Sequence, residues 1–162
     1  MTFTFCPRDA TPLVEREAGG KLRPCCPKEG CGFVAWGNPV PVVGAILEHE
    51  GSILLVRNKG WPAKLYGLVT GFLEAGETPE KGCLREVKEE LNLDGEIVSL
   101  VGAYSFEMRN ELIVAYHVRA TGTVKVSDEL EDYKRVDPNK LRAWEFGTGL
   151  AVRDWLARRG GA

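Results

Sequence analysis

Three glutamates near the middle of the chain have the spacing of a metal site. Glu86, Glu89 and Glu90 stand at positions i, i+3 and i+4 of a segment with helical character, so their carboxylates share one helix face. Glu86 and Glu90 repel each other one turn apart, and the last turn of a helix favours cations over carboxylates. A Mg²⁺ or Mn²⁺ ion, which prefers oxygen ligands, would relieve this repulsion. A solvated face with Arg85 and Lys88 as counter-charges is the alternative.

The helix that must carry these glutamates is predicted over residues 79–91. Thr78 can cap it by accepting a hydrogen bond from a first-turn N–H, and Pro79 suits the first helical position. Asn92 can end it in the left-handed conformation. Apolar residues at helical spacing predict its buried stripe, which consists of Leu84, Val87 and Leu91.

The helix is part of a longer pattern that resembles the signature of the Nudix hydrolases. The pattern starts at Gly71, reaches Glu77 after five residues and Arg85 after seven more, and ends with the helix glutamates. It agrees with Gly-x5-Glu-x7-Arg-Glu-(aliphatic)-x-Glu-Glu-x-Gly-(aliphatic) at every fixed position except the last glycine, which is Asn92 here. Asparagine also tolerates the left-handed cap. The resemblance covers residues 39–157 and implies an α+β fold, the α/β/α sandwich with a mixed β-sheet.

The resemblance also implies an activity, the hydrolysis of a nucleoside diphosphate linked to another group. In that family, metal ions offset the phosphate charge and activate the attacking water. By the motif match, the three helix glutamates are metal ligands and the carbonyl of Gly71 adds a further oxygen. Glu77 and Arg85 match the pair that braces the loop against the helix. A non-catalytic nucleotide-sensing or adaptor module is the alternative, but the intact run of glutamates favours an enzyme.

Two other stretches are similar to the NADH pyrophosphatase branch of the family. Residues 68–74 read Leu-Val-Thr-Gly-Phe-Leu-Glu where many Nudix sequences have Leu-Pro-Gly-Gly. The acidic stretch 128–132 resembles one that supplies a metal ligand, which makes Glu129 the candidate and Glu131 the reserve; an acidic surface turn is the alternative. The proline–tryptophan array of that branch is missing, and residues 104–111 stand in its place.

The substrate is therefore expected to be an adenosine diphosphate derivative, cut within the diphosphate to release AMP. ADP-ribose-like compounds and NADH rank above nucleoside triphosphates. Aromatic residues that could stack on the base, or could simply be core or strand residues, are Trp61, Tyr66, Phe72 and Phe106.

Four of the five cysteines lie within the first 31 residues, in an arrangement that resembles a zinc ribbon. Cys6 and Asp9 form the first turn, with the aspartate where a second cysteine is usual. Cys31 belongs to the second turn together with Cys25, Cys26 or both. Zn²⁺ held here would be structural, and unligated thiols are the alternative.

Composition and patterning predict two domains, residues 1–38 and 39–162, joined by the turn-rich stretch 36–39. A lone fifth cysteine, Cys83, is expected in the core. The second domain should contain strands at 40–48, 53–57, 65–70, 96–107, 111–121, 124–126 and 133–136, an acidic loop at 128–132, and a final helix at 148–159.

The overall charge sets the expected partners. The net charge is −2 with 27% charged residues, so no basic bias favours nucleic acid, and a small nucleotide is the expected partner. No apolar run reaches the ~18 residues of a membrane span, and the N-terminus does not resemble a signal peptide. A cytoplasmic location is expected, with either a monomer or a homodimer.

Overall fold

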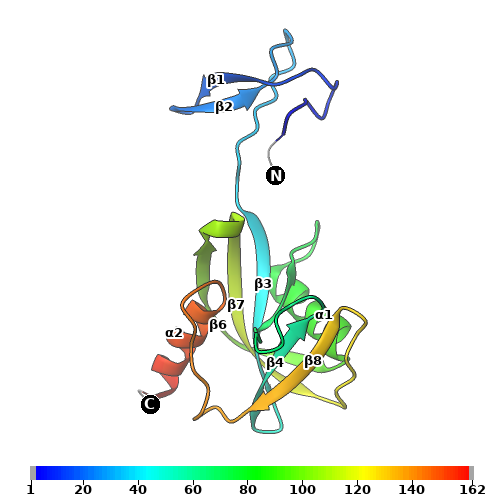
Figure 1. Ribbon diagram of the computed structural model, residues 1–162, viewed down its shortest axis with the longest axis vertical. Helices are drawn as coiled ribbons and strands as arrows, with labels where there is room; N and C mark the ends of the chain where they lie inside the picture. The colour runs from blue at the N-terminus through cyan, green and yellow to red at the C-terminus, as the bar shows by residue number, and fades with distance from the viewer. Residues whose placement is uncertain (1–2, 161–162) are drawn as a thin grey trace. The chain divides into compact units, whose positions relative to one another are not determined.

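The computed structural model describes residues 3–160, and the chain divides into two compact units, residues 1–39 and 40–162 (Figure 1). No helix within residues 3–160 is long and apolar enough to cross a membrane.

The first unit is built around one β-hairpin. Strand β1 (Val14–Ala18) pairs antiparallel with β2 (Lys21–Cys25). Gly19 and Gly20 form the turn, with φ of 60° and 75°. A two-residue hairpin turn with positive φ at both positions matches the twist of the strands, and glycine adopts it without steric cost.

The second unit is organised around a six-stranded mixed sheet. Along its main path the strand order is β6-β7-β3-β4-β8, and β5 pairs with β3 beside β4. The sheet is mixed because β3 and β7 run parallel, whereas the other neighbours are antiparallel. The strands are β3 (Val40–His49), β4 (Ser52–Asn58), β5 (Val69–Phe72), β6 (Asp94–Phe106), β7 (Glu111–Thr121) and β8 (Leu130–Val136).

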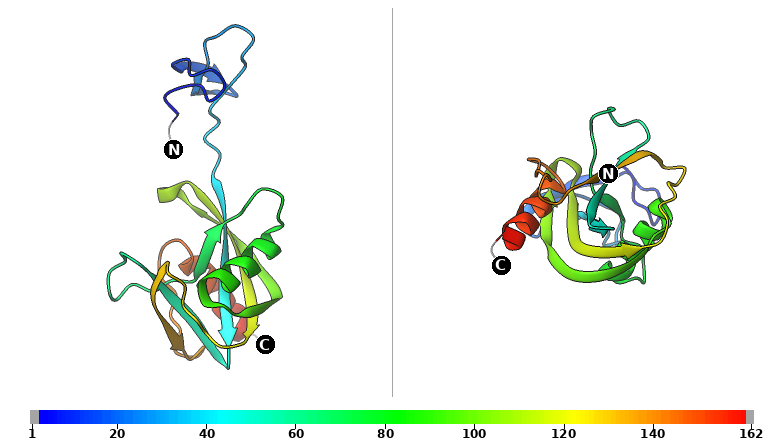
Figure 2. Two further views of the ribbon diagram at one scale, coloured as in Figure 1. Left: turned by 90° about the vertical axis from the view of Figure 1, so that its right-hand side faces the viewer. Right: turned by 90° about the horizontal axis from the view of Figure 1, so that it is seen from below.

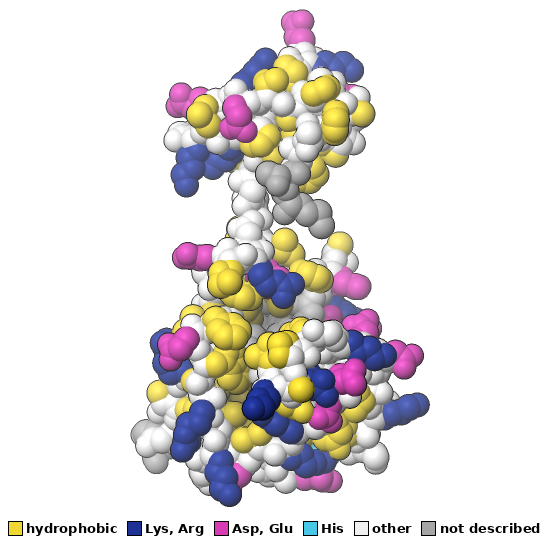
Figure 3. Space-filling model, viewed as in Figure 1, with side chains coloured by type: hydrophobic (Ala, Val, Ile, Leu, Met, Phe, Trp, Pro, Cys, Tyr) yellow, Lys and Arg dark blue, Asp and Glu magenta, His cyan; other side chains and the backbone are white. Residues whose placement is uncertain are grey.

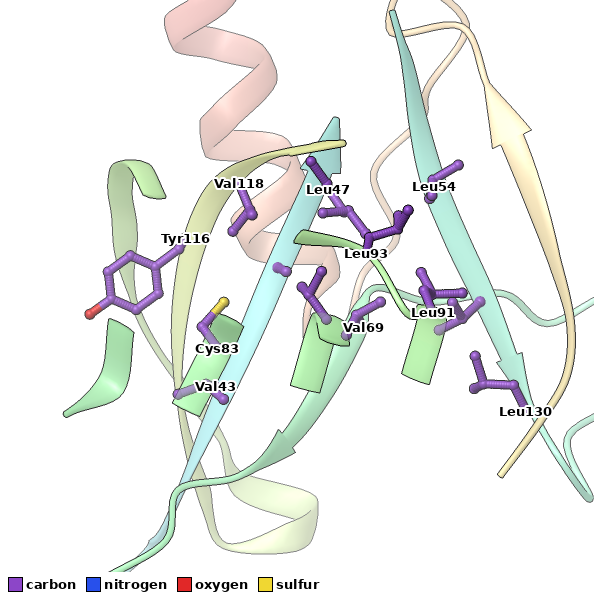
Figure 4. Close-up of a cluster of buried hydrophobic side chains, with 14 residues drawn as sticks. Val43, Leu47, Leu54, Val69, Cys83, Leu91, Leu93, Tyr116, Val118 and Leu130 are labelled. Carbon is purple, nitrogen blue, oxygen red and sulfur yellow. The ribbon is translucent and has the colours of Figure 1, made fainter. Parts of the chain in front are cut away.

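Two helices, α1 (Pro79–Leu91) and α2 (Gly149–Gly160), cover opposite faces of this sheet (Figure 2). Side chains alternate along β3, so Val43 and Leu47 face α1 while Ile46 faces α2. Figure 4 shows the cluster on the α1 side, where Leu91 and Val118 belong to the same buried group. The expected α+β fold, a mixed sheet between two helices, is confirmed.

The ends of α1 follow from its sequence. The Thr78 side chain accepts a hydrogen bond from the N–H of Lys81 at 3.4 Å, and Pro79 is the first helical residue. Asn92 ends the helix with φ of 58°, and its N–H donates to the carbonyl of Lys88 at 2.9 Å. Helix α1 thus begins and ends where the sequence predicts.

Three of the expected assignments, two strands and one loop, are corrected by the structure. Residues 124–126 form no strand, because the segment is tied to the end of α1, where Lys125 donates its N–H to the carbonyl of Leu91 at 2.9 Å. Only residues 128 and 129 form the acidic turn, since β8 already begins at Leu130. The strand expected at 65–70 is shifted, because β5 runs from Val69 to Phe72.

Candidate active site

The acidic helix face opens into a cleft of about 420 Å³, called the acidic cleft below. Glu86 and Glu90 of α1, Gly71 of β5 and Glu129 from the turn before β8 line it. Four of the five residues that the sequence suggested as ligands of the catalytic metal are thus brought to one place from three separate segments. Glu131, the reserve for Glu129, is exposed and is not part of the cleft lining.

Glu90 is the most buried carboxylate of the cleft, with 4% of its surface exposed. Its Oε2 atom is buried and has no hydrogen-bond partner among the described residues. Burial raises the pKa of Glu90 to about 8, and the charges of Glu86, Glu129 and Glu89 add to this effect. A buried acceptor that lacks a donor and lies among other carboxylates is suited to a cation.

Gly71 lies against the carboxylate of Glu86. A Cβ atom at position 71 would stand 1.8 Å from Cδ of Glu86, so any side chain larger than hydrogen would displace this carboxylate. Burial also raises the pKa of Glu86, although the ion pair with Arg85 opposes the rise. The glycine is therefore required by the close approach of β5 to α1.

Arg85 connects the glutamates to the preceding loop. Its guanidinium donates to both carboxylate oxygens of Glu77, at 3.2 Å from Nε and 2.8 Å from Nη2. Nη1 donates to Glu86 at 2.8 Å and to Glu89 at 2.9 Å, and Nη2 also donates to the carbonyl of Phe72 at 3.1 Å. These hydrogen bonds lower the pKa of Glu77 and raise that of Arg85.

Glu89 differs from its two neighbours. Its side chain is 58% exposed and does not line the cleft, because its carboxylate is held by Arg85. Lys88 points elsewhere and pairs with Asp94 at 2.8 Å. Cys83 is buried in the core as expected, where burial raises the pKa of its thiol to about 12.

A second cavity of about 180 Å³, called the aromatic pocket below, adjoins the acidic cleft. Three of the four stacking candidates line it: Trp61, Tyr66 and Phe106. Trp61 also lines the acidic cleft, as does Phe72. The Tyr66 hydroxyl donates to Asp132, which fixes the ring.

Four functional candidates in this region were missed from the sequence. Trp144 and Phe146 line the aromatic pocket from the irregular stretch before α2, where no periodicity marks a residue. Arg109 and Glu111 line both cavities and pair at 3.0 Å, and Glu111 is only 8% exposed. A charged residue directly before the apolar run 112–116 of strand β7 was the signal that could have identified Glu111.

The first unit contains a separate candidate metal centre. One ligand atom from each of Cys6, Asp9, Cys26 and Cys31 lies within 4.8 Å of the others. The sulfurs of Cys6 and Cys31 are 3.7 Å apart, close to the roughly 3.8 Å expected for two thiolates on one tetrahedral zinc. Cys25 lies outside the cluster, because it ends strand β2 and adjacent residues of extended chain point to opposite sides.

Asp9 occupies the fourth position of this cluster as an ionised carboxylate. The N–H of Thr11 donates to its Oδ1 atom at 3.1 Å, and this hydrogen bond is the main reason that its pKa falls to about 2. Lys28 approaches the other oxygen at 3.5 Å. Three sulfur atoms and one carboxylate are chemically suited to Zn²⁺.

Comparison with known proteins relates most of the chain to one family. Residues 38–155 match the family described as the NUDIX domain. The ADP-ribose pyrophosphatase of Methanocaldococcus jannaschii is 31% identical over 130 residues, which are 76% of this chain and 77% of that protein. The NAD-capped RNA hydrolase NudC of Pseudomonas aeruginosa is 26% identical over 142 residues, 85% of this chain. That of Mycobacterium tuberculosis is 30% identical over 111 residues, 67% of this chain. This chain spans only 50% and 35% of these two NudC proteins.

Solved structures share the fold at lower sequence identity. A NUDIX hydrolase from Nitrosomonas europaea has a TM-score of 0.78 at 24% identity, covering 98% of this chain and 94% of that one. An ADP-ribose pyrophosphatase from Streptococcus suis has a TM-score of 0.62 at 20% identity, covering 75% of this chain and 92% of that one. The family match, the 31% identical relative and the intact run from Gly71 to Glu90 lead to one conclusion: the chain is a Nudix hydrolase.

Proposed function

We propose that the acidic cleft hydrolyses the diphosphate linkage of an adenosine diphosphate derivative, with ADP-ribose-like compounds and NADH preferred over nucleoside triphosphates. The observation that carries the proposal is the buried, unpartnered Oε2 atom of Glu90 beside Glu86 and Glu129. Relatives named ADP-ribose pyrophosphatase and NAD-capped RNA hydrolase support the substrate class.

The carboxylates of the cleft fit a hard divalent cation, Mg²⁺ or Mn²⁺. Glu86, Glu90 and Glu129 would hold it, with the Gly71 carbonyl as a further oxygen and Glu89 at the exposed side. When bound, such an ion supplies positive charge that offsets the phosphate charge and acidifies the attacking water.

The remaining residues of the motif act by positioning. Arg85 fixes the carboxylates of Glu86 and Glu89, and Glu77 holds Arg85 by a bidentate ion pair. Because Glu77 also accepts the N–H of Glu74 at 2.8 Å, the loop before α1 is tied to the same arginine. The network therefore fixes the carboxylates before substrate arrives, which is what positioned catalysis requires.

In the reaction, water attacks one phosphorus of the diphosphate and the P–O bond of the anhydride breaks. The two products are AMP and the phosphorylated second group. The aromatic pocket is the proposed site of the base, with Trp61, Tyr66 and Phe106 as stacking candidates. Phe72 is placed to contact the substrate nearer to the diphosphate, since it lines the acidic cleft.

A hydrolysis screen tests this function. ADP-ribose, NADH and nucleoside triphosphates are compared with Mg²⁺ and then with Mn²⁺, and ³¹P spectra of products formed in ¹⁸O-labelled water identify the phosphorus attacked. The ¹⁸O label should appear in the AMP released from every ADP derivative or in the AMP from none of them. A kcat/KM for nucleoside triphosphates tenfold above that of every ADP derivative contradicts the substrate ranking.

We further propose that Cys6, Asp9, Cys26 and Cys31 hold one structural Zn²⁺ per chain. The support is the clustering of their ligand atoms, and four protein ligands leave no open position for catalysis. Elemental analysis of protein purified without added metal is the test, with about one zinc per chain expected.

A further inference from the structure

A third cavity lies on the other side of the aromatic pocket and has the opposite charge to the acidic cleft. It measures about 350 Å³, and we call it the basic groove. Tyr66, Trp144 and Phe146 line both the aromatic pocket and this groove. The three cavities are therefore neighbours in the order acidic cleft, aromatic pocket, basic groove.

Four cationic side chains line the basic groove: Lys64, Lys134, Lys140 and Arg142. No aspartate or glutamate is among its described lining residues, and within residues 3–160 none of the four cations forms an ion pair. The chain as a whole carries a net charge of −2, so this cluster is a local reversal of charge. Figure 3 shows apolar side chains and Lys or Arg side chains next to one another on the front face of the 40–162 unit.

Two of these cations contact neighbours that carry no charge. The Lys134 ammonium lies 4.2 Å from the ring centroid of Tyr66. Nη1 of Arg142 donates to the carbonyls of Asn139 at 3.3 Å and Leu141 at 3.1 Å. A guanidinium has five N–H groups, so others are available to an anion. A cluster of cations that contact uncharged groups in this way suits a compact, multiply charged anion.

On the basis of the function proposed above, we propose that the basic groove binds a phosphate group carried on the ribose of the nucleoside whose base occupies the aromatic pocket. The aromatic rings that the two cavities share would contact the nucleoside, and the cations beyond them would contact the phosphate. The same chemistry has two sources, a 2′-phosphate on a small nucleotide or the 3′-phosphodiester of an RNA chain.

The test compares the affinity of ligands that differ by this phosphate alone. Dissociation constants are measured by calorimetry for AMP, adenosine 2′,5′-bisphosphate, adenosine 3′,5′-bisphosphate and the trinucleotide pApApA, in buffer with Mg²⁺. At least one phosphate-bearing ligand should bind about tenfold more tightly than AMP, and this gain should shrink as the salt concentration rises. A gain for the 2′-phosphate assigns a small nucleotide, whereas a gain for the 3′-phosphate and the trinucleotide assigns RNA.

Variants locate the effect. The gain in affinity is the dissociation constant of AMP divided by that of the tighter ligand. Replacing Lys134 and Lys140 together by Gln should remove most of this gain. The control makes the same change of charge at Lys81 and Arg119, which are exposed and line none of the three cavities. The control should keep the ratio.

Two results overturn the proposal. The first is equal affinity for AMP and for every ligand with the additional phosphate, which includes the case in which none of them binds. The second is a gain in affinity that persists in the Lys134→Gln, Lys140→Gln protein. Hydrolysis of ADP-ribose is measured in parallel. Its absence would reject the proposed function while the binding ratio still reports on the groove.

Discussion

The carboxylate of Glu86 occupies the space that a side chain at position 71 would need, since a methyl group on Gly71 would lie 1.8 Å from Cδ of Glu86. This contact joins strand β5 to helix α1 at the acidic cleft. It also shows why a glycine begins the motif, where the sequence alone suggested only a carbonyl ligand.

Gly71→Ala is therefore expected to damage activity more than folding. The new methyl group must displace the Glu86 carboxylate, and a displacement of this size should lower kcat roughly 100-fold or more. Gly44→Ala on the adjacent strand β3 is the matched control, because a Cβ there meets other atoms only at 3.5 Å and beyond. Steady-state kinetics on ADP-ribose and thermal unfolding of both variants measure this. Equal kcat values for the two variants would show that the contact does not matter.

Arg85→Gln should lower both activity and stability, because it breaks the network that holds Glu77, Glu86 and Glu89. We expect a loss of about 1–3 kcal/mol in the free energy of unfolding and a fall in kcat without a matching rise in KM. Arg85→Lys keeps the charge but cannot donate bidentately to Glu77, so it should recover little of the activity or stability lost in Arg85→Gln.

The control for this experiment is Arg153→Gln. Arg153 pairs with Asp154 at 3.2 Å on the surface, where its side chain is 64% exposed. Such a pair contributes about 0–1 kcal/mol. If chemical denaturation gives the same loss for Arg85→Gln as for Arg153→Gln, the network around Arg85 is not structural.

Cys25 and Cys26 are adjacent in sequence but should differ in zinc binding. Cys26→Ser removes a ligand of the proposed site and is expected to lower the zinc content well below one per chain. Cys25→Ser lies outside the cluster and should keep the metal. Elemental analysis of both proteins decides the matter; zinc retained by the Cys26→Ser protein and lost by the Cys25→Ser protein would reassign the ligand.

Tyr104 and Asp154 provide a prediction about pH. The Tyr104 hydroxyl donates to Oδ2 of Asp154 at 3.0 Å, and this hydrogen bond lowers the pKa of Asp154. A carboxylate with a lowered folded-state pKa stabilises the fold above its unfolded value near 3.9, and this contribution disappears as the pH falls through the folded value. Burial, with the same hydrogen bond, raises the pKa of Tyr104 to about 12, so ionisation of the phenol plays no part at neutral pH.

Tyr104→Phe should therefore be less stable than the wild type at pH 7, and the gap should narrow towards pH 2. Thermal unfolding across this range is the measurement. A gap that is constant with pH would mean that the hydroxyl contributes through packing or another partner.

The sequence predicted those parts of the site that depend on local rules. The limits of α1 follow from Thr78, Pro79 and Asn92, and the shared face of its glutamates follows from helical spacing. Residues outside these rules were missed. Trp144 and Phe146 reach the aromatic pocket only through the packing of an irregular segment, and Glu111 meets the acidic cleft because β7 lies parallel to β3. Such placements depend on contacts between segments distant in the sequence.

At residues 124–126 the local sequence pattern predicted a strand that the structure does not form. The alternating apolar residues resemble a strand, but the backbone of the following Ser127 donates to the carbonyl of Glu90 at 2.9 Å instead of to a neighbouring strand. The end of α1 therefore holds this segment, and the acidic turn with Glu129 follows directly after it.

The central claim is that buried carboxylates of the cleft hold a divalent ion for diphosphate hydrolysis. Glu90→Gln tests it most directly, because the substitution keeps the shape of the side chain and removes its charge. The account predicts that the wild type hydrolyses ADP-ribose with Mg²⁺, loses this activity in EDTA and shows a thermal shift on adding Mg²⁺. In Glu90→Gln, kcat should fall by at least roughly 100-fold, and the Mg²⁺-induced shift should shrink. The metal-free variant should be at least as stable as the wild type, since the amide avoids the cost of ionising a buried carboxyl beside other carboxylates. Near wild-type turnover in Glu90→Gln, or full activity after exhaustive EDTA treatment, would contradict the account.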